Sequence, residues 1–96
     1  MFVVFLRFSE NKGNAGQFMD GHKAWIKQGF DDGVFLLAGS LQPNQGGGIL
    51  AHNVARTEIE ERVAADPFVV ERIVSAEIME LAPAMTDDRL AFLMEG

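Results

Sequence analysis

The sequence contains no cysteine, which excludes disulfide bonds, thiolate nucleophiles and zinc–thiolate sites and leaves nothing that points to an oxidising compartment. Basic residues are also few, because eight lysines and arginines stand against fourteen aspartates and glutamates, for a formal net charge of −6. Nucleic-acid binding needs a basic face, and this acidic balance argues against it.

Long apolar runs are missing as well. The apolar stretch at residues 2–8 is too short to span a membrane, and it lacks the basic start and small-residue cleavage site of a signal peptide. We therefore expect a cytoplasmic protein with no membrane partner.

The sequence offers no pattern typical of a metal or phosphate site. Its two histidines lack the spacing that would place them on one face of a helix. The glycine run at residues 46–48 joins two strands and does not open a helix, so it is no phosphate cradle. We expect neither a metal nor a cofactor.

The length of 96 residues, with 48% apolar and 23% charged residues, indicates one globular domain. A chain of this size hides only about two-thirds of its unfolded surface, so a second copy would add useful burial.

Apolar periodicity predicts the order strand, helix, strand, strand, helix, strand. The predicted strands are 2–8, 34–40, 49–54 and 74–81; the predicted helices are 14–28 and 58–65, with a loop at 41–48 and a short helical turn at 68–72. These elements make a domain over residues 1–83. Residues 84–96 form a C-terminal extension, predicted to hold a short helix.

Local signals mark the helix ends. Asn14 with Gln17, and Thr57 with Glu60, each resemble a capping box. Gly29 is the expected C-cap of the first helix.

With right-handed crossovers, this order predicts an α+β fold of the ferredoxin-like split βαβ type, a four-stranded antiparallel sheet with both helices on one face. The first strand is apolar on both faces, with Phe2, Val4, Leu6 and Phe8 on one side and Val3, Phe5 and Arg7 on the other. The uncovered face therefore predicts an isologous homodimer packed sheet to sheet. The C-terminal segment offers a route to a higher oligomer.

Asp66 stands just before Pro67, where the second predicted helix stops. Proline has no N–H to donate and pushes the preceding residue out of the helical region. A carboxylate at a helix C-terminus opposes the macrodipole, and such local conflicts gather at working sites. The alternative is that Asp66 simply starts a turn with Pro67.

Following the chain through this fold brings Arg7, His22, Ser40 and Asp66 to one end of the sheet. His22 and Asp66 can form a dyad in which the carboxylate orients one ring nitrogen and leaves the other free as a general acid or base. Arg7 can hold an anionic substrate group. Ser40 and backbone N–H groups near Gly39 can add hydrogen bonds to the substrate.

Each of these residues also has a purely structural interpretation. His22 lies on an apolar stripe with Phe18 and Trp25, where a buried structural histidine is common. Arg7 can pair with Asp66 or with a surface acid, and Ser40 can be a turn residue.

Three segments together resemble the YciI-like (YCII-related) family: His22–Ile26, Gly33–Ser40 and Ala65–Phe68. The resemblance covers residues 2–83 and departs from the family at Ser40, where proline is common. It implies a dimeric α+β barrel in which His22 and Asp66 are the family's histidine and aspartate. It also implies a lyase-type activity, the elimination of chloride from a chlorinated muconate-like acid in one branch.

The sequence thus predicts a cofactor-free lyase or isomerase that uses His22 and Asp66 for proton abstraction or elimination on a small anionic organic acid. One alternative is a non-catalytic module that binds a small ligand or mediates assembly. Another is a cofactor-free oxygenase-like activity, by analogy of fold alone. Hydrogen-bond reach between His22 and Asp66 beside an open cavity would favour the enzyme, whereas His22 sealed by Trp25 and Phe18 would favour a structural role.

Overall fold

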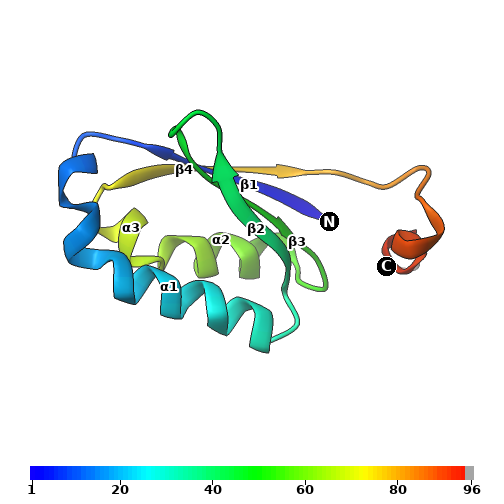
Figure 1. The fold of residues 1–96 in the computed structure, drawn as a ribbon. Coiled ribbons are helices and arrows are strands. Elements are labelled where there is room, and N and C mark those ends of the chain that lie inside the picture. Colours follow the sequence, from blue (N-terminus) through cyan, green and yellow to red (C-terminus); the bar gives the residue numbers. More distant parts are fainter. Residues whose placement is uncertain (95–96) are drawn as a thin grey trace.

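A computed structural model describes residues 1–94 and shows helices packed on one face of a four-stranded antiparallel sheet (Figure 1). The strands, in the spatial order β2-β3-β1-β4, are β1 (Phe2–Phe8), β2 (Phe35–Leu41), β3 (Gly46–Ala51) and β4 (Val74–Glu80). The helices are η1 (Lys12–Asn14), α1 (Ala15–Asp31), α2 (Arg56–Ala64), α3 (Pro67–Val70) and η2 (Asp88–Met94). The predicted element order and the ferredoxin-like α+β fold are confirmed.

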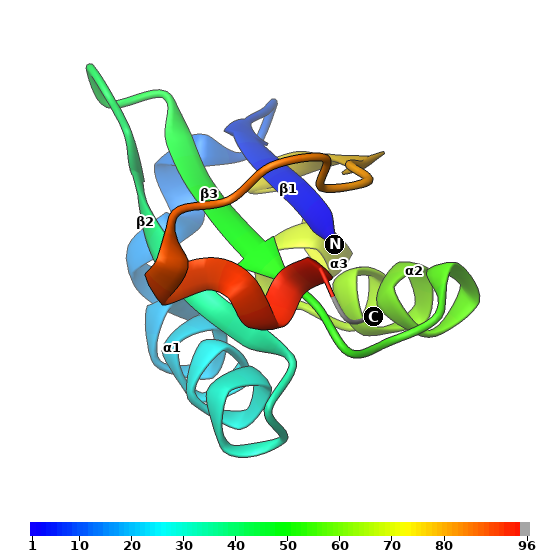
Figure 2. The same ribbon diagram turned by 90° about the vertical axis from the view of Figure 1, so that its right-hand side faces the viewer.

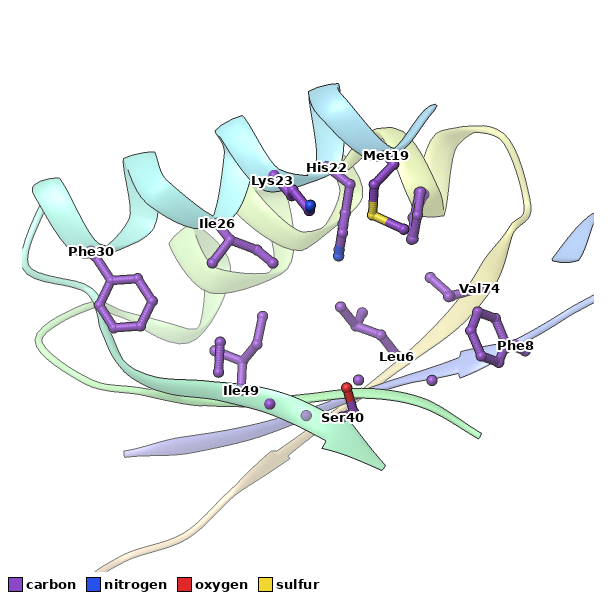
Figure 3. A pocket seen from close by; sticks show the side chains of 16 residues that line it. Leu6, Phe8, Met19, His22, Lys23, Ile26, Phe30, Ser40, Ile49 and Val74 are labelled. Carbon is purple, nitrogen blue, oxygen red and sulfur yellow. The ribbon is translucent and has the colours of Figure 1, made fainter. Parts of the chain in front are cut away.

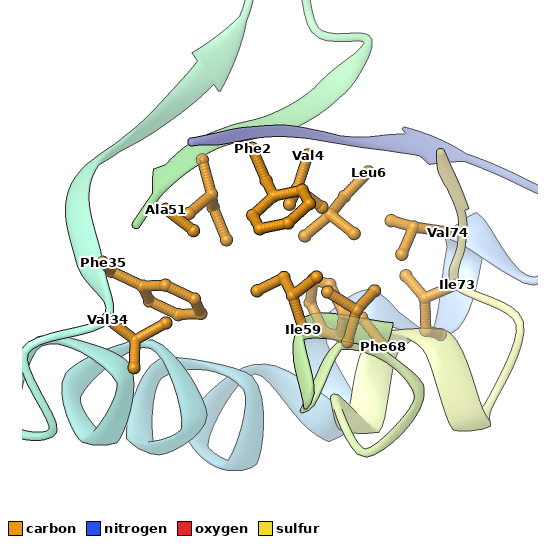
Figure 4. Close-up of a cluster of buried hydrophobic side chains, with 12 residues drawn as sticks. Phe2, Val4, Leu6, Val34, Phe35, Ala51, Ile59, Phe68, Ile73 and Val74 are labelled. Carbon is orange, nitrogen blue, oxygen red and sulfur yellow. The ribbon is translucent and has the colours of Figure 1, made fainter. Parts of the chain in front are cut away.

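The core lies between the sheet and the helices (Figure 4). Strand β1 occupies a central position, and its alternation buries Phe2, Val4 and Leu6 beneath the helices. Helix α2 contributes Ile59 and Val63 from the other side. Burying each such side chain stabilises the fold by about 1.5–3 kcal/mol, which fixes the helix layer against the sheet.

The predicted loop at 41–48 is too long, because Gly46, Gly47 and Gly48 belong to β3. Backbone groups alone form a strand ladder, and these glycines pair with Arg7, Leu6 and Phe5 of β1 in register. A Cβ at Gly46 would overlap the carbonyl group of Leu6. Glycine here permits close pairing of backbones, and β3 ends at Ala51, earlier than predicted.

The predicted helix ends are partly wrong. Asn14 is the N-cap of α1, but its side chain makes no capping hydrogen bond, and the N-cap of α2 is Ala55, ahead of Thr57. Helix α1 continues past Gly29 to Asp31. Gly29 is buried, and a Cβ there would overlap the ring of Phe35. Close packing between α1 and β2 therefore accounts for this glycine.

Polar contacts join α1 to α2. The indole Nε1 of Trp25 donates to the Arg62 carbonyl oxygen at 2.9 Å, and the Arg62 guanidinium donates to Asp32 Oδ2 at 2.9 Å. The hydrogen bond from Arg62, assisted by one from Gln28, lowers the pKa of Asp32 below its ordinary value of 3.8. These contacts set the spacing between the two helices that carry the candidate site.

The sheet face away from the helices carries apolar side chains, among them Leu37 and Met79, each 54% exposed. Beyond β4, the chain runs past the end of the sheet and turns back near the ends of β2 and β3 as η2 (Figure 2). Residues 95–96 of the predicted extension lie outside the described residues. Within residues 1–94, no helix has the length and apolar character needed to cross a membrane.

Candidate active site

Asp66 occupies the junction between α2 and α3 in an extended conformation. It is the N-cap of α3, with Pro67 in the first turn, and its Oδ1 accepts a hydrogen bond from the Phe68 N–H at 3.0 Å. Asp66 follows the C-terminal end of α2, as predicted, and it is also the N-cap of α3, a role that the prediction did not include. An N-cap is a position where aspartate is favoured, and the sharp turn at Asp66–Pro67 is what directs the carboxylate inward.

His22 and Asp66, which are 44 positions apart in the sequence, lie in hydrogen-bond contact. His22 Nδ1 is 2.8 Å from Asp66 Oδ1. The Asp66 side chain is 0% exposed, and its Oδ2 has no hydrogen-bond partner within the described part of the chain. Toward an ionised carboxylate, which only accepts, His22 Nδ1 would be the donor, and Nε2 of a neutral ring would then be an acceptor.

Aromatic stacking fixes the plane of the His22 ring. The ring lies parallel to Phe68, with 3.9 Å between centroids and 2° between planes, and it also stacks on Trp25 with centroids 5.9 Å apart. The hydrogen bond and the two stacked rings restrain the His22 side chain, but it remains 14% exposed and is therefore not fully enclosed. Orientation of this kind keeps a general base aimed in one direction.

The free edge of His22 faces a cavity of about 470 Å³ between α1 and the sheet (Figure 3). Its walls are mainly apolar, and its lining residues include Leu6, Phe8, Met19, Ile26, Phe30, Ile49, Phe68 and Val74. The polar side chains that line it belong to His22, Lys23 and Ser40, with no aspartate or glutamate among the lining residues. An apolar hollow with a few converging polar groups is typical of a small-molecule site.

Ser40 and Gly39 both line this cavity, together with His22. Ser40 pairs with Gly47 in the β2–β3 ladder, and its hydroxyl points up from the sheet toward α1 (Figure 3). Gly47 and Ala38 also line the cavity, and because neither carries a long side chain they leave space on the sheet side of it. The structure thus brings together four of the five residues nominated from the sequence: His22, Asp66, Ser40 and Gly39.

The structure does not bring Arg7 to this group. Arg7 lies on the opposite sheet face, where its guanidinium pairs with Glu77 at 2.7 Å and lies over the Phe5 ring at 4.6 Å. Of the alternatives for Arg7, pairing with a surface acid is the arrangement observed. The strand alternation that buries Leu6 turns its neighbour Arg7 outward.

Sequence reasoning missed two residues at the site, Lys23 and Phe68. Lys23 falls beside the apolar stripe of α1, and its exposed side chain lines the cavity next to the helix (Figure 3). Phe68 follows Pro67 in the third resemblance segment, which was the available signal for its position next to Asp66. Within residues 1–94, no group of three or more potential metal ligands gathers.

No family model matches the chain, and no curated protein matches it either. Among solved structures, it resembles 5-chloro-2-hydroxyhydroquinone dehydrochlorinase (TftG) from Burkholderia phenoliruptrix AC1100, in complex with 2,5-dihydroxybenzoquinone. The TM-score is 0.61 over 84% of this chain and 93% of that chain. At 13% sequence identity, this likeness shows a shared fold.

Proposed function

We propose that the chain is a YciI-like, cofactor-free enzyme of the lyase or isomerase type, in which His22 and Asp66 move a proton on a small anionic organic acid. The observation that carries the proposal is the 2.8 Å contact between His22 Nδ1 and the wholly buried Asp66 carboxylate, beside a cavity that the ring faces. A structural histidine does not need an open cavity at its second nitrogen.

The geometry supports a general-base step. His22 Nε2 takes a proton from a substrate C–H bond, or from a ring hydroxyl in a hydroquinone, and the electron pair of that bond forms a carbon–carbon or carbon–oxygen double bond. A leaving group on the adjacent or conjugated carbon departs with its own bonding electrons. Asp66 stabilises the imidazolium formed meanwhile, and a base of this kind contributes about 10²–10⁴-fold in rate. Returning the proton to another carbon of the same molecule would give an isomerase.

The structural neighbour suggests the first compounds to test, because its name describes the loss of chloride from a chlorinated hydroxyhydroquinone. A thermal-shift screen with 5-chloro-2-hydroxyhydroquinone and small carboxylic acids would select ligands. Each ligand would then be incubated in deuterated water and followed by proton NMR and by chloride release. We expect loss of a C–H signal or release of chloride with the native chain.

The His22→Gln variant supplies the decisive comparison, since glutamine can still donate to Asp66 but cannot take a proton. We expect it to bind the selected ligand and to turn it over at least about 100-fold more slowly. Equal turnover by both proteins would overturn the proposal. Ligands that bind the native chain without any exchange or product would favour the alternative, a small-ligand-binding module.

A further inference from the structure

Lys23 directly follows His22 on α1, and its side chain, although exposed, lines the same cavity. Figure 3 shows both side chains on the side of the cavity that α1 forms. A cation and a candidate base therefore both border the space that a bound molecule would fill.

The lysines of α1 differ in their partners. Lys27, one turn further on, pairs with Asp31 at 2.7 Å. Among the ion pairs of residues 1–94, none involves Lys23. The positive charge at Lys23 is thus available to a ligand, while the charge of Lys27 is matched on the protein.

The charges around Lys23 indicate which kind of ligand the cavity favours. The chain carries a formal net charge of −6, yet the residues that line the cavity include no aspartate or glutamate. A small anion would meet repulsion over much of the surface and attraction at this position, because an ammonium group acts as a compact point charge.

We infer that Lys23 forms the anion subsite of the cavity and that the ligand is a small monoanion with an apolar body. Its charged oxygen binds the Lys23 ammonium, and its body contacts the apolar walls. The next step rests on the proposed function. The charged oxygen of the ligand lies within a few atoms of the proton that His22 removes. When the bond to that proton breaks, the proton passes to Nε2, the electron pair of the bond forms the double bond, and Lys23 offsets the negative charge of the ligand.

Benzoate and benzamide provide a matched pair of probes, since they have nearly the same shape and differ in charge. We would titrate each into the protein and follow amide chemical shifts by NMR. The native chain is expected to bind benzoate about tenfold more tightly than benzamide, the effect of one charge-assisted contact. Lys23→Met should remove this preference, Lys23→Arg should retain most of it, and the control Lys27→Met should leave it unchanged.

This test does not depend on catalysis. In a His22→Gln background, turnover is expected to fall at least about 100-fold while the preference for benzoate stays, so failure of the proposed function and failure of this inference are separate results. A preference that survives in Lys23→Met, or that falls equally in Lys27→Met, would overturn the inference. Absence of benzoate binding at millimolar concentrations would do the same.

Discussion

At the scale of single residues, one carboxylate oxygen holds two parts of the site together. Asp66 Oδ1 accepts from the Phe68 N–H, which forms the cap of α3, and also contacts His22 Nδ1. Asp66 Oδ2 is buried without a partner in the described chain. A buried, half-satisfied carboxylate gains stability from a positive charge beside it, and in the proposed reaction the imidazolium of His22 supplies that charge.

Two substitutions of Asp66 distinguish its role as the N-cap of α3 from its role as a negative charge beside His22. In Asp66→Asn, the amide oxygen still accepts from the Phe68 N–H, so the cap is retained, but no negative charge remains to stabilise the imidazolium. We expect turnover to fall by about 10²–10⁴-fold with little change in urea denaturation. Asp66→Ala also loses the cap, and its free energy of unfolding should be lower by at least about 1 kcal/mol. Full turnover by Asp66→Asn would contradict the dyad.

Chain order was sufficient to predict the meeting of His22 and Asp66, because the crossover of each helix fixes which sheet end it reaches. The same reasoning placed Arg7 at the correct end but not on the correct face. The alternation of β1 already put Arg7 with Val3 and Phe5, away from the helices. Lys23 was beyond prediction, because its place beside the cavity depends on side-chain length and on how far α1 stands from the sheet.

At the scale of elements, the approach of α1 to β2 depends on the missing side chain of Gly29. The Phe35 ring fills the space where a Cβ would lie, whereas nothing lies within 4 Å of a Cβ at Gly16 on the same helix. The two glycines therefore form a matched pair, one in a close contact and one in the open.

We expect Gly29→Ala to destabilise the fold by about 1–3 kcal/mol, because the added methyl group forces Phe35 or the helix to move. Gly16→Ala should be neutral or stabilising by up to about 1 kcal/mol, because alanine restricts the unfolded chain. Urea denaturation of both variants measures the difference. Equal effects would show that helix propensity, and not packing, governs Gly29.

Sequence alone could not assign Gly29 correctly. A glycine near a helix end is typical of a C-cap, and the residues that follow, Asp31, Asp32 and Gly33, offer a second stop. Helix α1 ends at the second stop signal, where Gly33 has a φ of 74°, and Gly29 lies inside the helix. The choice depends on Phe35, which packs against α1 from a different element.

At the scale of the whole molecule, the chain exposes more surface than a monomer of its mass should. Its accessible area is 6146 Å², whereas a folded monomer of 10.5 kDa exposes roughly 5,400 Å². The excess of roughly 700 Å² is close to the roughly 800 Å² that each partner buries in a standard interface. Exposed Leu37 and Met79 on the open sheet face, and Met85 beyond it at 92% exposure, are where such an interface would gain burial.

We propose that a second copy covers this open face, and light scattering coupled to size exclusion tests the proposal. The native chain is expected to have twice the mass of one chain. Leu37→Lys should give a folded monomer, because its side chain is already half exposed and a dimer would bury an unpaired ammonium group from each copy. Val70→Lys is the matched control, since Val70 is 59% exposed but lies on α3 in the helix layer, and it should remain dimeric. A native chain that elutes as a monomer would show that the apolar sheet face is exposed to water, and a monomeric Val70→Lys would place the interface on the helices instead.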